Sequence, residues 1–569
     1  MAVIARLSLA FVALSLAAGA APALAVTASE LVPDGLPLTL SGSYLAGRSA
    51  DNSHDLQPAI RYYNGALEAD PENPTLLERV LILHLAAGQF DGTDSLAERL
   101  TAVDARNPLA RLLLASRALK AGAFGDAQTQ LSQAVKAPLS VLTTGLLTAW
   151  AYQGLGNTDM ALKTVDGLNG PPWYGIFKSY HHALIANAAG RTDDAVNAIT
   201  GAYKTDSTAL RVVEAYARIL APAGKRDEAI RALAMFLNAQ PNQPVIRQLL
   251  ADLQAGKTPE PIARSAQVGA AEVLYGLGSA IGADDGAELP SAYLQLAHFL
   301  DPNAYLPLLA LGDLLQQSDR CEDAIALYGR IPADSILRRF ADIQSGLCLE
   351  QLDRVDEAAA HIKRVIDADP TDLEAVMALG NIYRAHNRFT EAADAYSRGI
   401  DQIKDPAKGD WRIFYYRGVS FERSKRWPEA EKDFRQALAN NPQQPQVLNY
   451  LGYSWVDRGE NLDKALDMIK KAVDLRPNDG YIVDSLGWAY FKLGRFDDAV
   501  EQLERAVELK PEDSVINDHL GDALWKVGRK REATFQWNHA RDLDPEPAER
   551  EKIVKKLENG LAANGRNDG

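Results

Sequence analysis

The sequence predicts an all-α protein, a right-handed superhelical solenoid in which helix–turn–helix units stack in chain order. Two observations carry this prediction. A small residue returns about every 34 residues, and each unit repeats the same order of large and small side chains. A fixed period of this length is typical of repeats that each form one pair of helices. The period is seen at Gly47, Leu81 (the one large exception), Ala115, Ala149, Ala183 and Ala217, then at Gly278, Gly312, Gly346 and Gly380, and with small insertions at Gly418, Gly452, Gly487 and Gly521.

The residues around Gly487 explain why the period needs a small side chain. The first helix of a pair meets the second there, and two larger side chains would overpack the contact, at a cost of roughly 1–3 kcal/mol. We expect Ala499 to face Gly487, and Leu503 continues the apolar stripe of the second helix. Pro511 cannot continue that helix and is tolerated where the next one starts. The pattern resembles the tetratricopeptide repeat (TPR), which implies a scaffold with a binding groove.

Residues 1–25 are expected to form a cleaved secretory signal. Arg6 gives the positive start, a short apolar segment runs from Leu7 to Ala18, and Ala23-Leu24-Ala25 is a small-x-small cleavage site. The apolar segment is short for a permanent membrane anchor. The sequence therefore predicts a periplasmic or secreted protein, cleaved near Ala25 and without stable membrane insertion.

Breaks in the repeat pattern divide the rest of the chain. Val245 to Gln254 looks like a first helix whose second helix is missing, and the breaker run from Gly256 to Pro261 takes its place. Glu549 to Glu558 is a charged helix suited to cap the open end of a solenoid. The predicted parts are a signal peptide (1–25), an extended leader (26–42), an N-terminal array (43–244), an unpaired helix and linker (245–263), a C-terminal array (264–545), and a capping helix with a disordered tail (546–569).

Composition and motifs argue against several classes of function. The net charge of −15 at pH 7 disfavours nucleic acid as a partner, because that partner needs a basic face. Two glycine-containing segments are partly similar to nucleotide-binding loops: Gly256 to Thr258 and Gly276 to Gly282. Neither follows a predicted strand, which such loops require. No His, Cys, Asp and Glu set has metal-ligand spacing, and no Ser or Cys has a nucleophile context. We expect no metal, cofactor or catalytic residue, and a cell-wall-processing enzyme is the less favoured alternative.

The two cysteines leave two interpretations open. Cys321 is expected to open the second helix of one unit, and Cys348 to lie late in the first helix of the next. These helix ends meet on the same edge of a solenoid. In an oxidising compartment a disulfide between them is plausible, and it needs Cα atoms within about 7 Å. The alternative is that both are small buried apolar residues.

The groove is where we expect function to lie. Counting the small residue as position 8, positions 2, 5, 9 and 12 of the first helix line the groove in this repeat. Six of the eight tryptophans follow residue 410, and exposed aromatic side chains anchor interfaces. The sequence predicts an aromatic and partly acidic strip, with packing inside the superhelix as the alternative for Trp488 and Trp525. The Lys/Asn/Arg set by which some TPR domains clamp a terminal carboxylate is absent at these positions. The predicted partner-binding residues are Tyr415, Asn449, Tyr453, Tyr481, Asp484, Trp488, Asp518, Asp522 and Trp525.

The last three units carry a closer resemblance. They read Tyr450-Leu-Gly-Tyr-Ser-Trp455, Asp484-Ser-Leu-Gly-Trp488 and His519-Leu-Gly-Asp-Ala-Leu-Trp525. This stretch resembles the C-terminal repeats of secreted TPR proteins of Gram-negative bacteria, among them lipoprotein adaptors that bring envelope proteins to carboxyl-terminal processing proteases. The resemblance implies a non-catalytic periplasmic scaffold, in its sharper form a protease adaptor. The alternative is an assembly chaperone for exported or outer-membrane proteins. The chain departs from the adaptors in having no lipid-bearing cysteine near the cleavage site.

Overall fold

The computed structural model describes residues 39–53, 55–281 and 286–561. These residues form α-helices joined by turns, with a short 3-10 helix at Pro406–Lys408 and no strand among them, which confirms the predicted all-α solenoid. The chain divides into two compact units, unit 1 up to Ala341 and unit 2 from Asp342. The predicted signal peptide, the leader up to residue 38 and the tail from residue 562 lie outside the described residues.

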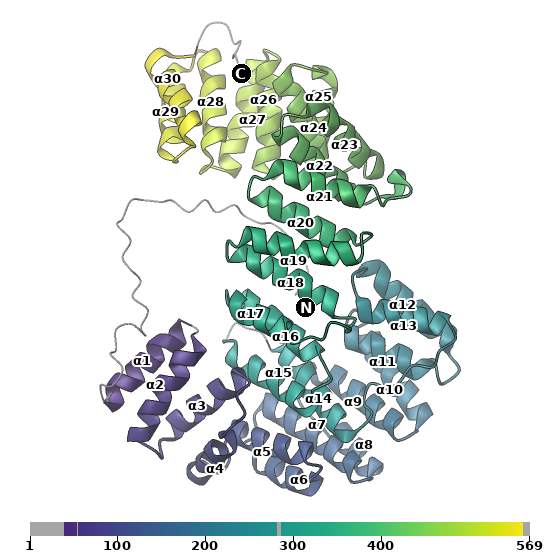
Figure 1. The fold of residues 1–569 in the computed structure, drawn as a ribbon. Helices are drawn as coiled ribbons and strands as arrows, with labels where there is room; N and C mark the ends of the chain where they lie inside the picture. The colour runs from purple at the N-terminus through teal and green to yellow at the C-terminus, as the bar shows by residue number, and fades with distance from the viewer. Residues whose placement is uncertain (1–38, 54, 282–285, 562–569) are drawn as a thin grey trace. The chain divides into compact units, whose positions relative to one another are not determined.

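Thirty α-helices are described (Figure 1). Unit 1 holds α1 (Leu40–Asn52), α2 (Leu56–Ala69), α3 (Pro74–Ala86), α4 (Thr93–Val103), α5 (Pro108–Lys120), α6 (Phe124–Gln133), α7 (Pro138–Gly154), α8 (Thr158–Asp166), α9 (Tyr174–Ala188), α10 (Thr192–Thr205), α11 (Leu210–Leu220), α12 (Arg226–Ala239), α13 (Pro244–Gln254), α14 (Ala266–Ala280), α15 (Glu288–Leu300), α16 (Leu306–Gln317) and α17 (Cys321–Tyr328). The division between the units runs through α18 (Arg338–Gln351). Unit 2 continues with α19 (Val355–Ala368), α20 (Leu373–Ala385), α21 (Phe389–Ile400), α22 (Trp411–Arg423), α23 (Trp427–Asn440), α24 (Pro445–Arg458), α25 (Leu462–Leu475), α26 (Gly480–Lys492), α27 (Phe496–Leu509), α28 (Ser514–Lys526), α29 (Lys530–Asp542) and α30 (Pro547–Asn559).

Each repeat is a pair of antiparallel helices, which we call A and B. In unit 2 the A helices α20, α22, α24, α26 and α28 pack against the B helices that follow them, and each B helix packs against the next A helix. The small residue of the period lies where A meets B. A Cβ on Gly487 would stand 2.5 Å from Cγ of Leu503, and one on Gly418 would stand 2.7 Å from Cε1 of Phe434. The predicted close approach is confirmed, with Leu503 rather than Ala499 as the side chain nearest Gly487.

The sequence also marks where helices begin and end. Asn73 precedes α3, and its side-chain oxygen accepts hydrogen bonds from the backbone N–H of Thr75 and Leu76 at 3.1 and 3.2 Å. Such a cap satisfies N–H groups that have no partner inside the helix. Pro74 follows as the first helical residue, where the absent N–H costs nothing. The same Asn-Pro start recurs at Asn107 before α5.

Unit 1 departs from a simple stack after α13. The predicted unpaired helix is present as α13, and no helix follows it until α14 begins at Ala266. The chain then returns onto the repeats that precede it. α14 pairs with α15, packs against α7 and also contacts α9 and α5, while α15 packs against α3 and contacts α5. Figure 1 shows α14 and α15 beside the A helices α3, α5 and α7. The sequence had assigned these two helices to the second array.

Close contacts fix α14 and α15 in this position. A Cβ at Gly269 of α14 would overlap the indole ring of Trp150 in α7, so only glycine allows this approach. Glu272 of α14 is buried and forms an ion pair with Arg211 of α11. The hydroxyl groups of Thr143 in α7 and Tyr293 in α15 are hydrogen-bonded at 3.1 Å. α14 and α15 thus belong to the core of unit 1. The predicted limits of the two arrays, at residues 244 and 264, describe the repeat spacing of the sequence and stay a prediction.

The C-terminal cap of unit 2 is confirmed. α30 packs against α29 and ends at Asn559, before Gly560 with its left-handed φ of 70°. The Lys556 ammonium group donates hydrogen bonds to Asp518 at 2.6 Å and to Asp522 at 2.8 Å, both on α28. The last A helix therefore has a partner from within the chain.

Candidate binding groove

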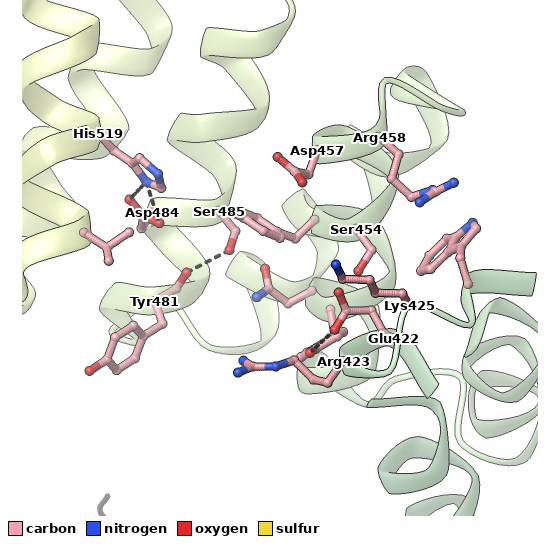
Figure 2. Close-up of a pocket in the computed structure, with 15 residues that line it drawn as sticks. Glu422, Arg423, Lys425, Ser454, Asp457, Arg458, Tyr481, Asp484, Ser485 and His519 are labelled. Carbon is pink, nitrogen blue, oxygen red and sulfur yellow. Dashed lines mark hydrogen bonds and ion pairs between the residues drawn. The ribbon is translucent and has the colours of Figure 1, made fainter. Parts of the chain in front are cut away.

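The A helices of unit 2 form a pocket of about 690 Å³ (Figure 2). Its wall comes from α22, the turn after it, the start of α23, and one face each of α24, α26 and α28. Positions that share this face recur every three or four residues along a helix. We call it the groove pocket. It is lined by Glu422, Arg423, Lys425, Trp427, Asn449, Tyr450, Tyr453, Ser454, Asp457, Arg458, Tyr481, Asp484, Ser485, Val515 and His519.

The middle of the groove pocket is aromatic. Tyr450 donates its hydroxyl hydrogen to Glu422 at 3.1 Å, which fixes its ring. Tyr453, one helical turn further along α24, is half-buried, and burial together with the carboxylates of Asp484 and Asp457 raises its pKa. Both phenols are therefore neutral hydrogen-bonding groups at physiological pH. Tyr481 of α26 is 53% exposed and offers the most accessible ring of the wall.

A buried ion pair closes the α28 end of the groove pocket. Nδ1 of His519 lies 2.9 and 3.2 Å from the two carboxylate oxygens of Asp484 (Figure 2). Burial alone would lower the pKa of His519, but the carboxylates of Asp484, Asp518 and Asp522 together raise it above the usual histidine value. The surrounding carboxylates thus favour the protonated form of His519.

Two polar atoms of the wall lack a hydrogen-bond partner. Oδ1 of Asn449 and Nε1 of Trp427 are buried and have no partner in the part of the chain that the structure describes. Leaving such an atom without a partner costs about 1–3 kcal/mol. One is an acceptor and the other a donor, so a polypeptide backbone or polar side chain can satisfy both.

Four of the predicted binding residues line the groove pocket, and the other five do not. Asn449, Tyr453, Tyr481 and Asp484 line the groove pocket together, and their contact with a partner stays a prediction. Tyr415 lies beside it, with its ring perpendicular to that of Tyr450 at 6.0 Å. Burial raises the pKa of Tyr415 to about 12.

Trp488 differs from the expectation of an exposed aromatic strip. Its side chain is only 9% exposed and is stacked between Phe491 at 4.8 Å and His519 at 4.0 Å. The burial favours the packing alternative, and contact of Trp488 with a partner stays a prediction. Trp488 is buried because position 9 of α26 turns toward the neighbouring A helix, where His519 completes the stack.

The acidic end of the predicted strip is covered by the cap. Asp518 and Asp522 are bound by Lys556, and burial raises the pKa of Asp522 to about 6 although Lys556 lowers it. Trp525 is half-buried, with its ring 5.2 Å from that of Trp537. A Cβ on Gly560, just after α30, would overlap the Trp525 ring. These three residues therefore contact the chain's own C-terminal segment.

Sequence reasoning missed the residues at the α22 end of the groove pocket. Arg423, Lys425, Trp427 and Arg458 line it but fall outside positions 2, 5, 9 and 12 of an A helix, whereas Glu422 is at position 12 and was not among the predicted residues. Lys425 lies in the turn and Trp427 opens α23. The sequence did contain one indication of this end: Lys425 occupies a turn position where most other repeats have Gly, Asp or Asn.

The cysteines are placed as predicted within their helices. Cys321 is the first residue of α17 and Cys348 lies late in α18, and both are buried. Cys321 belongs to unit 1 and Cys348 to unit 2, so the disulfide stays a prediction. Over the described ranges no three His, Cys, Asp or Glu residues are grouped as metal ligands. Within the same ranges no helix combines the length and the apolar character that crossing a membrane requires.

Comparison with known families agrees with this geometry. Residues 186–253, 344–407 and 410–480 match tetratricopeptide repeat models, and residues 487–528 match a TPR repeat model. These segments carry tetratricopeptide repeats, within an all-helical chain. The matched segments include α22 to α25, α27 and α28, while residues 481–486 of α26 lie between two matches, so most of the groove pocket lies on repeats of this type.

Known relatives are similar to only part of this chain. It is 27% identical over 187 residues to a TPR repeat-containing protein of Pseudomonas aeruginosa, covering 32% of this chain and 31% of the relative. It is 25% identical over 166 residues to the general transcriptional corepressor ssn6 of Schizosaccharomyces pombe, covering 29% and 15%. The chain thus spans less than a third of the length of these relatives.

Solved structures with similar helices were also found. A tetratricopeptide repeat protein from Parabacteroides merdae aligns with a TM-score of 0.38 and 15% identity, over 45% of this chain and 99% of that one. The APC/C hetero-tetramer Cut9–Hcn1 aligns with a TM-score of 0.37 and 12% identity, over 92% and 96%.

Proposed function

We propose that this TPR protein is a non-catalytic scaffold that binds a segment of a partner protein in the groove pocket. The observation that carries the proposal is the pocket itself. Its volume of about 690 Å³ falls within the range of about 300–1,000 Å³ that is usual for binding sites. Its wall combines neutral tyrosines with the unsatisfied Oδ1 of Asn449, which can accept a hydrogen bond from a partner's backbone.

The proposed location is the periplasm, or outside the cell. The signal-like pattern of residues 1–25 supports it. N-terminal sequencing of the mature protein should then start within a residue or two of Val26, in a soluble envelope fraction. Mature protein that keeps Met1 would overturn this part of the proposal.

The proposed partners are envelope proteins. The resemblance of residues 445–545 to adaptors of carboxyl-terminal processing proteases favours a protease and the substrates delivered to it. An assembly chaperone for exported or outer-membrane proteins is the second candidate, since a groove with both aromatic and polar groups can hold many unfolded segments. A cell-wall-processing enzyme is disfavoured, and turnover of peptidoglycan by the purified protein alone would revive it.

In-cell photocrosslinking tests the groove directly. A photoreactive phenylalanine analogue replaces Tyr481, which lines the groove pocket, or Phe535 of α29, which is 68% exposed and does not line it. The proposal expects a discrete crosslinked partner at position 481 and not at 535. One protease with a few substrates indicates an adaptor, and many clients indicate a chaperone. Equal crosslinking at both positions would refute binding in the groove.

A further inference from the structure

We propose that the α22 end of the groove pocket binds a carboxylate side chain of the partner segment, with Lys425 and Arg423 as the cations that receive it. This inference rests on the proposed function and adds the chemistry of the partner: an acidic polypeptide segment. We call Arg423, Lys425 and Arg458 the cationic end of the groove pocket (Figure 2).

The first observation is the backbone of Lys425. Its φ is +63°, in the left-handed region that residues with a Cβ rarely adopt. The turn between helices A and B needs this conformation throughout the chain, and elsewhere a residue suited to it is present. The corresponding turn residues with positive φ are Gly88, Gly122, Gly156, Gly190, Gly224, Gly256, Asp319, Asp353, Asn387, Gly459, Gly494 and Gly528.

A lysine at this turn therefore costs backbone free energy that glycine would avoid. Glycine adopts positive φ freely, and Asn or Asp does so more readily than Lys. Unfavourable backbone conformations of this kind concentrate at functional sites. Lys425, which has this unfavourable conformation, also lines the groove pocket. We therefore connect its backbone conformation with binding.

The second observation is the state of the cations. Across the described residues, no carboxylate lies within ion-pair distance of Lys425 or Arg423, whereas Arg426 next to them pairs with Glu429 at 3.0 Å. Arg423 instead lies over the ring of Phe389 at 4.9 Å. Two cations without a carboxylate partner among the described residues therefore stand at one pocket, in a chain of net charge −15.

Arg458 and Trp427 complete the cationic end. Arg458 pairs with Glu460 at 3.1 Å and lies 5.0 Å over the Trp427 ring, which orients its guanidinium group. Nε1 of Trp427 is the buried donor without a partner described above. Hydrogen bonds from charged donors to a carboxylate are the stronger ones.

The acidic residues of the same pocket are already engaged. Glu422 accepts the hydroxyl hydrogen of Tyr450, and Asp484 pairs with His519. Asp457 lies 3.8 Å from Nζ of Lys492. At the α22 end, Arg423 and Lys425 have no carboxylate partner among the described residues, while Glu422 beside them keeps its charge; the two cations can pair with a carboxylate of a partner rather than with an ammonium group.

The test uses the full-length protein and defined peptides. The protein is first screened against an array of random decapeptides, and the strongest binders are remade with each Glu or Asp changed to Gln or Asn. Affinities are then measured by fluorescence anisotropy. We expect the binders to be acidic, and the decisive acid-to-amide change to weaken binding at least tenfold.

Three variants locate the effect. Lys425→Gly and Arg423→Gln should each abolish the preference for the acidic peptide over its amide form. Lys425→Gly gives the turn the residue that most other repeats have, so we expect it to stay folded and to melt slightly later than the wild type. Lys432→Gln is the matched control: it removes an exposed charge of α23 that does not line the pocket, and should change nothing.

Each other outcome counts against the inference. Binders without acidic residues, or an array without binders, would overturn it. Capture of phosphatidylglycerol vesicles that Lys425→Gly abolishes, without acidic-peptide selection, would reassign the cationic end to a membrane surface. Peptides that lose affinity on Tyr453→Ala but show no acid preference would refute the inference and leave the proposed function standing. Peptides unaffected by both Tyr453→Ala and Lys425→Gly would refute both.

Discussion

Replacing Trp488 by alanine should destabilise unit 2. The side chain is 9% exposed, stacked between Phe491 and His519, and has Nζ of Lys492 5.2 Å from its ring centre. Truncation of a buried Trp to Ala costs about 3–5 kcal/mol. For a unit of this size, each kcal/mol shifts the melting temperature by about 2–4 °C, so the expected loss is roughly 6–20 °C.

Thermal melting followed by circular dichroism measures this effect, and Tyr481→Ala is the control. Tyr481 lies on the same helix and is 53% exposed, so its truncation should change the free energy of unfolding by less than about 0.5 kcal/mol. Trp488→Ala should therefore melt well before Tyr481→Ala. A Trp488→Ala protein that melts with the wild type but no longer binds its partner would show that the ring is a contact residue and that our reasoning from burial is wrong.

Three further predictions follow from particular contacts. The raised pKa of His519 stabilises the fold below the ordinary histidine pKa of about 6.5, and this stability is lost as pH rises through the raised folded value. The free energy of unfolding in urea should therefore fall more steeply with rising pH for the wild type than for His519→Gln. Parallel curves of that free energy against pH would contradict the prediction. Gly418→Ala, whose Cβ would meet Phe434, should lower the free energy of unfolding by about 1–3 kcal/mol. Gly201→Ala on α10, whose Cβ would have nothing within 4 Å, should raise it by about 0.5–1 kcal/mol. Chemical denaturation should show changes of opposite sign, and changes of the same sign would refute the packing argument. If Cys321 and Cys348 are joined, the loop of about 27 residues adds roughly 3–4 kcal/mol; titration of denatured, unreduced protein should find no thiol, and two thiols would reject the bond.

The repeat fold could be read from the sequence because its determinants are local. The small residue at Gly487 and the proline at Pro511 fix where two helices meet and where the next one starts, and both lie within one repeat. The same logic brought Asn449, Tyr453 and Tyr481 to one face, since positions three or four apart and equivalent positions of neighbouring A helices lie side by side. The charged capping helix was also visible, because it follows the last repeat directly.

What could not be predicted depends on distant contacts. The residues near Asp522 in the sequence do not indicate that it will bind Lys556, which lies 34 residues later. The burial of Trp488 depends on His519 of the next A helix completing a stack. The return of α14 onto α7 depends on Trp150 fitting over Gly269, and no periodic pattern encodes that fit. Lys425 was overlooked for a different reason: the groove positions were counted on A helices alone.

The return of α14 and α15 changes how unit 1 has to fold. An open solenoid can nucleate at any repeat and grow by neighbouring contacts. In unit 1 the ion pair of Arg79 with Glu288 joins residues 209 positions apart, and Lys120 donates to the carbonyl oxygen of Phe299 across 179. Closing a loop of that length instead of one repeat costs about 1.6 kcal/mol more in chain entropy, and non-local closure slows folding.

Until that closure happens, the apolar faces of α3, α5 and α7 that will receive α14 and α15 are open to water. Their core positions belong to one continuous apolar cluster that runs from Ala50 to Leu300. Exposed surface of this kind makes partly folded chains prone to aggregate. The first 250 residues are therefore an incomplete folding unit, and a protein truncated before α14 should collect in aggregates even though every one of its repeats is intact.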